Sequence, residues 1–571
     1  MKWRVLAACV VLAAGPLSAG QSKLSKDIDQ KANGKIDVIV QFLRPPTDAN
    51  HKRVANLGGE PKRNLNLLGA AVYSIPPGQL KKLAEDPDVL FITPDRKVKG
   101  ALDLTAAAVN AAAAASSYGL DGSGVGIAVI DSGITPNADF LAGAGTASRI
   151  VYSEDFTGSG TATDAYGHGT HVAGIAAGNG KNSSASNATR LFRGIAPGAS
   201  IVNLRVLDGT GAGSDSTVIA AIERAIALKA LFNIRVMNLS LGRGIYESYA
   251  LDPLCRAAEA AWKAGILVTA AAGNFGRYSA RGISGYGTIT APANDPYVLT
   301  VGAMRSMGTP GRADDRVATY SSKGPSLYDH VVKPDIVAPG NQVRSVLNSP
   351  SGTIFVSYPA TRVPLSYYLA GGLGISSNYL SLSGTSMATP VVSGAAALLF
   401  QQNPSLTPDQ VKARLMKTAY KTFPTSSIAF DYSGRVYVSY YDLFTVGAGY
   451  LDVQAALANS DLAMGAALSP IAVYNRVTDS GTLSFLPGSV WLNSVVWGSS
   501  VVWGSSQFVN GTSVVWGSSV VWGSSVVWGS SAPEDGFSVV WGSCADDSGS
   551  VVWGSASLAV DPMSVMLQGE N

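Results

Sequence analysis

The chain has few charged residues and little net charge of either sign. Lys, Arg, Asp and Glu make up 14% of its 571 residues, hydrophobic residues make up 46%, and the formal net charge is +3. Disordered acidic or basic proteins combine low hydrophobicity with high net charge, so this composition excludes them. No basic run is interleaved with aromatic residues, and we therefore expect no nucleic-acid partner.

Cysteine is also scarce. The three cysteines are Cys9, Cys255 and Cys544, and none belongs to a Cys-x-x-Cys pair. Cys9 lies in the expected signal peptide described next, and two distant cysteines do not make a disulfide framework. Cys255 falls in a stretch, 251–264, that is typical of a helix. We expect it to be a buried, small apolar residue.

Long apolar runs are missing beyond the first residues. A positive start at 1–4 precedes ten apolar residues at 5–14 and the small-residue cleavage site Leu17-Ser18-Ala19. This order predicts a secretory signal peptide over residues 1–20. Ten residues cannot span a bilayer, which needs about 20. We therefore expect the protein to be secreted or at the cell surface.

Residues 21–101 have the pattern of a separate small α+β domain. Apolar residues alternate along 36–42, and two more strands are predicted at 69–75 and 89–93. A short amphipathic helix is predicted between them, at 77–84.

Residues 102–458 are predicted to form an α/β domain. Nearly continuous apolar runs at 125–130, 201–206, 236–240 and 266–271 alternate with helical stretches such as 216–231. Strands covered on both faces have this pattern, which indicates a parallel sheet. Functional sites of such sheets lie outside the carboxyl ends of the strands. Asp131 and Asn274 each follow one of these runs.

The composition changes again over residues 459–571. Lys and Arg are missing after Arg476, while eight of the ten tryptophans lie in this region. Val-Val-Trp-Gly occurs seven times, starting at Val495, Val501, Val514, Val520, Val526, Val539 and Val551. Short β-branched and aromatic segments between Gly-Ser turns predict a β-rich repeat tail.

Three separated motifs rich in small residues carry the candidate catalytic groups. They are 129–133 with Asp131, 167–174 with His168, and 384–390 with Ser386. An apolar helix is predicted to open at Ser386, where free N–H groups favour a developing oxyanion. The alternative is that Ser386 only caps that helix. Asp131 ends an apolar strand, where an unpaired carboxylate is costly, unless 131–133 forms only a turn.

The chain has only four histidines, which limits the candidates for the catalytic base. They are His51, His168, His171 and His330. His51 lies in the first domain, and His330 lies among polar loop residues. His168 and His171 are neighbours on one helical face. A zinc pair is the competing use of this spacing, but a glutamate and a third ligand are missing from it.

The order Asp, His, Ser and the residues around each resemble the subtilisin-like serine proteases, the subtilases. The resemblance covers residues 30 to 458 and leaves out the tail. It implies that Asp131 orients His168, that His168 is the base, and that Ser386 is the nucleophile. It also implies that Asn274, in the segment 270–274, donates to the oxyanion. With the base assigned to His168, we expect His171 to be a packed, hydrogen-bonded core residue.

The same resemblance implies an extended peptide cleft. Its substrate-binding residues would be Ser240, Leu241, Gly242, Gly211, Gly213, Ala271 and Gly273. Small apolar walls without an evident acid favour uncharged side chains. The chain is longer than compact family members between residues 340 and 386. The extra stretch, at 347–380, is either a flap near the cleft or a remote hairpin.

The family pattern also implies that residues 21–101 are an inhibitor propeptide, with self-cleavage between residues 97 and 104. Partners would be protein or peptide substrates and the chain's own propeptide. No cofactor is required for the chemistry. A structural calcium ion is possible, with Asn179, Asn182 and Asn187 as oxygen ligands, although a solvated polar loop explains these residues equally well.

The sequence thus predicts a secreted serine endopeptidase of α/β fold, made as a self-processing precursor. Two alternatives stay open. The protein could be a surface adhesive or structural protein whose tryptophan repeats are its main functional part, and the repeats have no assigned partner. It could also hydrolyse esters, because the same acyl-enzyme chemistry serves both substrates.

Overall fold

The computed structural model forms two compact units, Met1–Lys99 and Gly100–Asn571. It describes residues 23–25, 28, 34–65, 69–94, 101–102, 104–143, 145–278, 283–430, 434–475, 480–485, 487–490, 496–497, 501–502, 508–509, 513–516, 520–521, 566 and 570. The predicted signal peptide, Cys9, Cys544 and most of the repeat tail lie outside the described residues, as do residues 95–100 and 103 of the predicted self-cleavage stretch.

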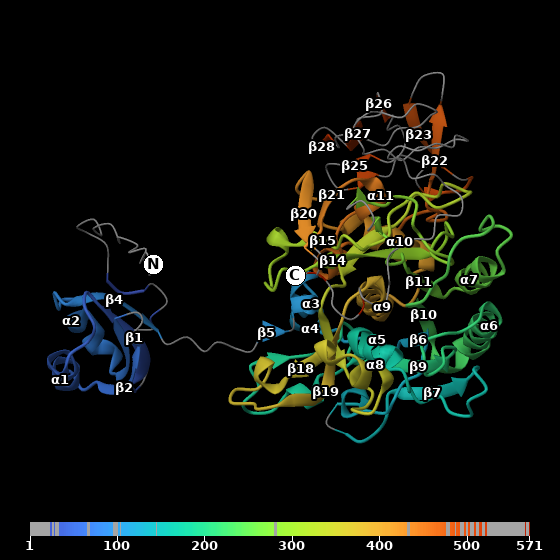
Figure 1. Cartoon of the computed structure of the whole chain (residues 1–571). Helices are drawn as coiled ribbons and strands as arrows, with labels where there is room; N and C mark the ends of the chain where they lie inside the picture. Colours follow the sequence, from blue (N-terminus) through green and yellow to red (C-terminus); the bar gives the residue numbers. More distant parts are fainter. Residues whose placement is uncertain are drawn as a thin grey trace, which may run out of the picture. The chain divides into compact units, whose positions relative to one another are not determined.

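The smaller unit is an antiparallel sheet with two helices (Figure 1). Its strand order is β2-β3-β1-β4. The elements are β1 (Ile36–Phe42), α1 (Asp48–Asn56), β2 (Glu60–Leu65), β3 (Ala70–Ile75), α2 (Leu80–Ala84) and β4 (Val89–Pro94). Val38, Val40 and Tyr73 are fully buried in its core. The alternating pattern of β1 places Val38 and Val40 on one face, in the same core as helix residues Val54, Leu80 and Leu83.

The larger unit is built on a sheet in the order β15-β14-β11-β10-β6-β9-β7, with β16 paired to β14. All neighbours are parallel except β14 and β15. The strands are β6 (Gly126–Asp131), β7 (Ile150–Asp155), β9 (Ser200–Arg205), β10 (Ile234–Leu239), β11 (Leu267–Ala271), β14 (Leu299–Arg305), β15 (Arg316–Val317) and β16 (Ile336–Pro339).

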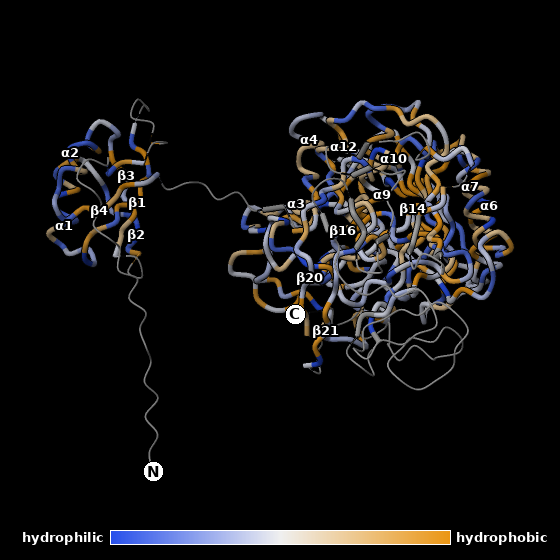
Figure 2. Tube along the Cα trace, turned by 90° about the horizontal axis from the view of Figure 1, so that it is seen from above, coloured by the Kyte–Doolittle hydropathy of each residue, from blue (hydrophilic) through white to orange (hydrophobic). Residues whose placement is uncertain are grey.

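Helices cover both faces of this sheet (Figure 1). On one face α9 (Thr385–Gln402) packs against β10, β11 and β14, with α5 (His168–Ala177) beside it. On the other face α6 (Asp215–Phe232) packs against β10 and α7 (Pro253–Lys263) against β11. Figure 2 shows hydrophobic segments gathered around β14 and α9. This double cover explains why the strands have nearly continuous apolar sequences.

Local signals set the helix boundaries. The Ser214 side chain accepts from the Thr217 N–H, which starts α6 one residue before the predicted 216. Asp252 accepts from the first N–H groups of α7, and Pro253 occupies its first turn. Helix α9 begins at Thr385 with Gly384 as its cap, so Ser386 is its second residue rather than the start that the sequence predicts.

The remaining elements surround this layered body. They are β5 (Ala101–Leu102), α3 (Leu104–Ala108), α4 (Ala112–Tyr118), β8 (Arg190–Leu191), β12 (Arg277–Tyr278), β13 (Ile283–Ser284), β17 (Val343–Val346), α8 (Thr353–Ser357), β18 (Arg362–Pro364), β19 (Ile375–Leu382), α10 (Pro408–Thr418), β20 (Ser426–Phe430), β21 (Val436–Tyr440), α11 (Leu443–Val446), α12 (Val453–Ala458), β22 (Ile471–Asn475) and β23 (Ser480–Ser484). Among the described residues, no helix combines the length and hydrophobicity needed to cross a membrane.

The extra stretch at 347–380 contributes β18 and β19 to a three-stranded sheet with β17. Tyr368 and Tyr379 are buried against Phe192. The Tyr379 hydroxyl donates to Asp139 Oδ2 at 2.8 Å. These contacts anchor the stretch beside Phe192 and Asp139. Its start also packs on the segment before His168, where Asn348 Nδ2 donates to the Asp164 carbonyl oxygen at 2.8 Å and the Ile354 N–H donates to the Tyr166 carbonyl oxygen at 3.1 Å. The flap and the remote hairpin both stay predictions.

Parts of the repeat tail form short antiparallel pairs. β24 (Val496–Trp497) pairs with β25 (Val501–Val502), and Val496 lies opposite Val502. Another sheet has the order β26-β27-β28, from β26 (Phe508–Val509), β27 (Ser513–Trp516) and β28 (Val520–Val521). In both places neighbouring repeats pair with each other.

Candidate active site

A cleft of about 450 Å³ lies at the carboxyl ends of the central strands of the larger unit. Ser240 follows β10, and Asn274 follows β11. His168 and Ser386, which come from the first turns of α5 and α9, also line it. The topology therefore brings the histidine and serine motifs together in one cavity.

Asp131 is the last residue of β6 and makes direct contact with His168. Its Oδ1 atom lies 2.8 Å from His168 Nδ1 and accepts the Ser132 N–H at 2.7 Å. The exposed fraction is 1% for Asp131 and 6% for His168. Since Asp131 needs a donor at this distance, Nδ1 carries the proton and Nε2 is left as the basic nitrogen of neutral His168.

A second buried carboxylate fixes the helix that carries His168. Asp164 accepts the N–H groups of Gly167 at 2.7 Å and Thr170 at 2.9 Å, at the start of α5. It also accepts the Ser132 hydroxyl, which in turn accepts the Gly169 N–H, both at 2.9 Å. Asp164 thus satisfies helix N–H groups that have no partner within the helix and ties α5 to the end of β6.

The environment of His168 raises its pKa. Burial by itself lowers the pKa of an imidazole, but the charge and hydrogen bond of Asp131, with the charge of Asp164, outweigh that effect. His168 is therefore better able to hold a proton than an ordinary histidine.

The pKa of His171 is lowered rather than raised. It is fully buried, and burial lowers its pKa to about 3. Its Nε2 atom lies 3.0 Å from the Val343 carbonyl oxygen and 3.2 Å from that of Leu380. Groups of three or more His, Cys, Asp or Glu side chains that could hold a metal do not occur in the described part of the chain. A neutral, packed His171 fits this environment.

Ser386 is half-buried, and its side chain borders the cleft. Its hydroxyl donates to the Ser240 carbonyl oxygen at 3.0 Å, and the Ser240 hydroxyl donates to the Ser386 carbonyl oxygen at 2.8 Å. These two bonds join the start of α9 to the end of β10. In this structure the Ser386 hydroxyl is therefore bonded to Ser240 rather than to His168.

Asn274 is held by its oxygen, which leaves its amino group for another acceptor. Its Oδ1 atom accepts the Thr385 N–H at 2.9 Å and the Thr385 hydroxyl at 3.1 Å. A Cβ on Gly384 would lie 3.1 Å from Asn274 Nδ2, so glycine at this position lets the amide approach α9 closely. The Asn274 amino group lies beside the N-terminus of the helix that carries Ser386.

All seven residues expected to bind substrate line the cleft: Ser240, Leu241, Gly242, Gly211, Gly213, Ala271 and Gly273. The lining also contains Asp215, although no acid was expected in the walls. Asp215 is paired with Arg243, which also contacts the buried Asp252. Arg243, which also lines the cleft, is thus shared between two acids. The extra stretch at 347–380 contributes none of the lining residues described.

The asparagines considered as calcium ligands take part in other hydrogen bonds. Asn179 Oδ1 accepts the Lys181 N–H, and Asn182 donates its amino group to Asn137 Oδ1. Asn187 instead donates to the Ala370 carbonyl oxygen in the extra stretch. The nearby Asp139 carboxylate already accepts from Asn182 and Tyr379. The side-chain oxygen of Asn179 and the Asp139 carboxylate thus already accept from N–H and O–H donors, whereas the bonds of Asn182 and Asn187 engage their amino groups.

Cys255 lies away from the cleft and is fully buried. Its thiol donates to Asn294 Oδ1 at 3.2 Å, and burial raises its pKa. A thiol that stays protonated is a poor nucleophile, so Cys255 has the structural role expected of it.

Two residues of the site, Asp164 and Met566, are not predicted from the sequence. Asp164 lies four residues before His168 and could have been suspected as an acid near a helix start. Met566, near the chain's end, also lines the cleft, and it lies outside every motif.

Comparison with known proteins agrees with this geometry. Residues 122–449 match the Subtilase family. Serine protease AprX of Bacillus subtilis (strain 168) is 35% identical over 398 residues, which cover 67% of this chain and 82% of that protein. The chain belongs to the subtilase family.

The chain is also similar to a second relative and to a protein of known structure. Subtilisin E of Bacillus subtilis (strain 168) is 33% identical over 441 residues, 76% of this subtilase and 94% of subtilisin E. A cold adapted subtilisin-like serine proteinase of known structure is 31% identical, with a TM-score of 0.38, covering 53% of this chain and 85% of that one. The protein is a subtilisin-like serine endopeptidase, and its substrates are proteins or peptides.

Replacing Gly169 by alanine should disturb the site of this subtilase. The new Cβ would meet the Gly133 carbonyl oxygen at 2.3 Å and Asp131 Cβ at 3.1 Å. Overpacking of this kind costs about 1–3 kcal/mol of stability. A shift of about 1 Å at the catalytic groups can lower kcat by about 10²-fold.

Denaturant unfolding and peptide hydrolysis measure both effects. Gly311→Ala is the control, because a Cβ there has no neighbour within 4 Å. Equal stability and activity of the two variants would show that the contact between α5 and β6 is not tight.

Proposed function

We propose that Asp131, His168 and Ser386 form the catalytic triad of this endopeptidase, with Asn274 in the oxyanion hole. The observation that carries the proposal is the 2.8 Å contact between Asp131 Oδ1 and His168 Nδ1, beside a cleft that also contains Ser386. A buried base held in one tautomer and a half-buried hydroxyl are the parts that acyl transfer requires.

In the first half of the reaction, the Ser386 hydroxyl oxygen attacks the peptide carbonyl carbon. His168 Nε2 takes the hydroxyl proton and then gives it to the leaving amine, so that the C–N bond breaks and an acyl-enzyme ester remains. Water repeats the sequence, with His168 again as base, and releases the acid. Asp131 accepts the Nδ1 hydrogen bond and stabilises the imidazolium that forms in each step.

The oxyanion is stabilised by Asn274 Nδ2 and the Ser386 N–H. Support comes from the Thr385 hydrogen bonds, which occupy Asn274 Oδ1 and leave the amino group as a donor. The first turn of α9 adds the positive end of a helix dipole. Donors fixed before the reaction need no reorganisation when the charge develops.

We also infer that the chain is made as a secreted precursor. Residues 1–20 act as the signal peptide, and the first compact unit acts as the inhibitor propeptide. Self-cleavage takes place between residues 97 and 104. The repeat tail has no part in the chemistry proposed here, and no calcium ion is assigned.

Ser386→Ala should abolish hydrolysis and maturation together. Loss of the nucleophile lowers kcat by about 10⁶-fold, and the variant should accumulate as a precursor that retains residues 21–101. Intact mass and N-terminal sequencing of the purified chain measure this. Normal processing of the variant, without another protease present, would contradict self-cleavage by Ser386.

Asp131→Asn should change the pH profile as well as the rate. In the parent enzyme kcat/KM should fall as the pH drops through the raised pKa of His168, above the ordinary value of about 6.5, because only neutral His168 acts as a base. The variant loses the charge that raises this pKa, so its acid limb should move to lower pH. Its kcat should fall by about 10⁴-fold.

The measurement is kcat/KM against pH for both enzymes. An acid limb that does not move would show that another group controls the rate. Glu223→Gln, a change at an exposed position of α6, controls for the loss of one negative charge.

Asn274→Ala should lower kcat by about 10²–10³-fold with little change in KM, because the lost hydrogen bond forms mainly in the transition state. Steady-state kinetics with a short peptide substrate separate the two constants. A rise in KM with an unchanged kcat would instead place Asn274 in ground-state binding.

A further inference from the structure

The C-terminal end of the chain reaches the active-site cleft. Met566 lines the cleft with His168 and Ser386 and is 9% exposed. Its carbonyl oxygen accepts the Ser383 N–H at 2.9 Å, three residues before Ser386. The contact therefore lies on the segment that leads into the nucleophile.

Four residues later, Glu570 enters a buried pocket that is selective for a carboxylate. Its Oε1 atom contacts Arg277 Nη2 and the Thr319 hydroxyl and accepts the Thr319 N–H at 3.0 Å. Its Oε2 atom lies 3.4 Å from Arg305 Nη1. Glu570 is 3% exposed, so both carboxylate oxygens face donors inside the protein.

The pocket also holds the backbone of Glu570. Asn341 donates to its carbonyl oxygen at 2.9 Å and accepts its N–H at 2.9 Å, and Gln342 donates to the same carbonyl at 3.3 Å. Such paired main-chain contacts fix the direction of a peptide as well as its charge. A site that binds the side chain, the backbone N–H and the carbonyl oxygen of one residue has the contacts of a peptide-binding site.

Contacts besides Glu570 also hold Arg277. Arg277 donates through Nε to the Thr319 hydroxyl at 2.7 Å, and its guanidinium lies over the rings of Tyr437 and Tyr320. Arg277 and Arg305 are 6% and 4% exposed. Buried guanidinium groups are costly without a nearby anion, and Glu570 supplies one to both.

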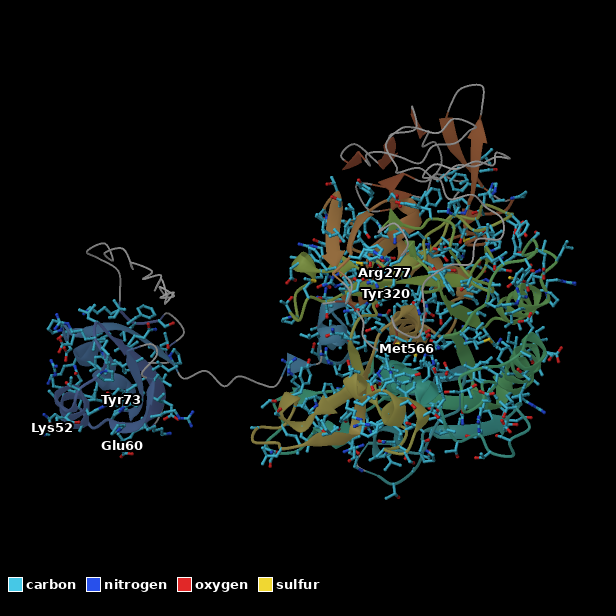
Figure 3. The ribbon with its side chains drawn as sticks, in the orientation of Figure 1. Lys52, Glu60, Tyr73, Arg277, Tyr320 and Met566 are labelled. Carbon is cyan, nitrogen blue, oxygen red and sulfur yellow. The ribbon has the colours of Figure 1, made fainter. Side chains whose placement is uncertain are left out.

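Hydrogen bonds join the loop beside the pocket to the segment that leads into Ser386. Gly384 donates its N–H to the Gly340 carbonyl oxygen at 2.8 Å, and Gln342 donates its N–H to the Ser383 hydroxyl at 2.9 Å. The loop that holds the Glu570 backbone thus runs beside the segment that binds Met566. Figure 3 shows Arg277, Tyr320 and Met566 following one another across the larger unit.

We propose that the end of this chain is a built-in competitive ligand of its own active site, with Met566 in the cleft and Glu570 as the anchor in the arginine pocket. The inference rests on the proposed function, since it assumes that the cleft is where peptides are cleaved. While the anchor is seated, Met566 occupies space that a substrate needs. When it leaves, the pocket is a subsite for an acidic peptide residue.

The hydrogen bond that holds Met566 in the cleft also keeps its carbonyl group from being attacked. Among the described contacts, the Met566 carbonyl oxygen is bonded to Ser383 rather than to the oxyanion donors Asn274 and Ser386. A carbonyl held away from the oxyanion hole is not activated for attack. The segment therefore blocks the cleft without being cleaved at Met566.

Glu570→Gln in the full chain is the test, with a short chromogenic peptide as substrate. Loss of the buried ionic contacts should release the segment, so KM should fall by about tenfold while kcat stays unchanged. Glu223→Gln, an exposed change on α6, is the matched control and should leave KM at the parent value. Equal KM values for Glu570→Gln and the control would overturn the proposal.

Met566→Ala is a second variant that tests the proposal if the Glu570→Gln protein does not fold. This variant keeps the Glu570 contacts but removes side-chain bulk from the cleft, and it should also lower KM without changing kcat. An unchanged KM for a folded Met566→Ala enzyme would assign the C-terminal segment a purely structural role and overturn the proposal.

A synthetic peptide of residues 560–571 gives an independent measurement. It should bind the Glu570→Gln chain by calorimetry and raise its KM, and a peptide carrying the same Glu570→Gln change should bind at least about tenfold more weakly. Absence of binding would contradict the inference. Binding without hydrolysis by any variant would instead refute the proposed function and leave the peptide site standing.

Discussion

A buried carboxylate in contact with a buried imidazole is the interaction on which this site depends. Asp131 and His168 are both removed from water, and burial alone would lower the pKa of the histidine. Placed 2.8 Å from the Asp131 carboxyl, His168 instead has a raised pKa. The geometry fixes the tautomer as well, because Nδ1 must face Asp131.

The rest of the fold serves to keep this contact in place. Asp131 is rigid because it ends a central strand, β6, with parallel neighbours on both sides. Asp164 and the Ser132 hydroxyl tie the start of α5 to that strand end. The reciprocal bonds between Ser240 and Ser386 do the same for α9 and β10. Four elements far apart in sequence thereby meet at one edge of the sheet.

Much of this could be predicted, because the main signals are local. Apolar runs covered on both faces identify parallel strands, and small residues identify places where backbones approach, as at Gly169 beside Gly133. The edge strand β2 was missed because its side chains are mostly exposed and polar, so it lacks alternation. The pairing of Asp215 with Arg243 was missed because it joins residues whose proximity only the folded chain creates.

The contacts of Met566 and Glu570 could not be predicted from the sequence, for a related reason. Neither residue belongs to a motif, and more than two hundred residues of sequence separate Glu570 from Arg277 and Arg305. Only packing shows that two buried arginines have an acid between them. The same contacts link Met566 and Glu570 to the segment that carries Ser386. Substrate access to the cleft and the stability of the residues at its edge therefore depend on the same contacts.

The central claim is that His168, with its pKa raised by Asp131, activates Ser386. The most direct measurement is the rate of labelling by a fluorophosphonate as a function of pH, with the modified residue mapped by mass spectrometry. The account predicts a single label on Ser386, formed at a rate that rises with pH through a pKa above that of an ordinary histidine. A label on another residue, or a rate that does not change across this range, would contradict it.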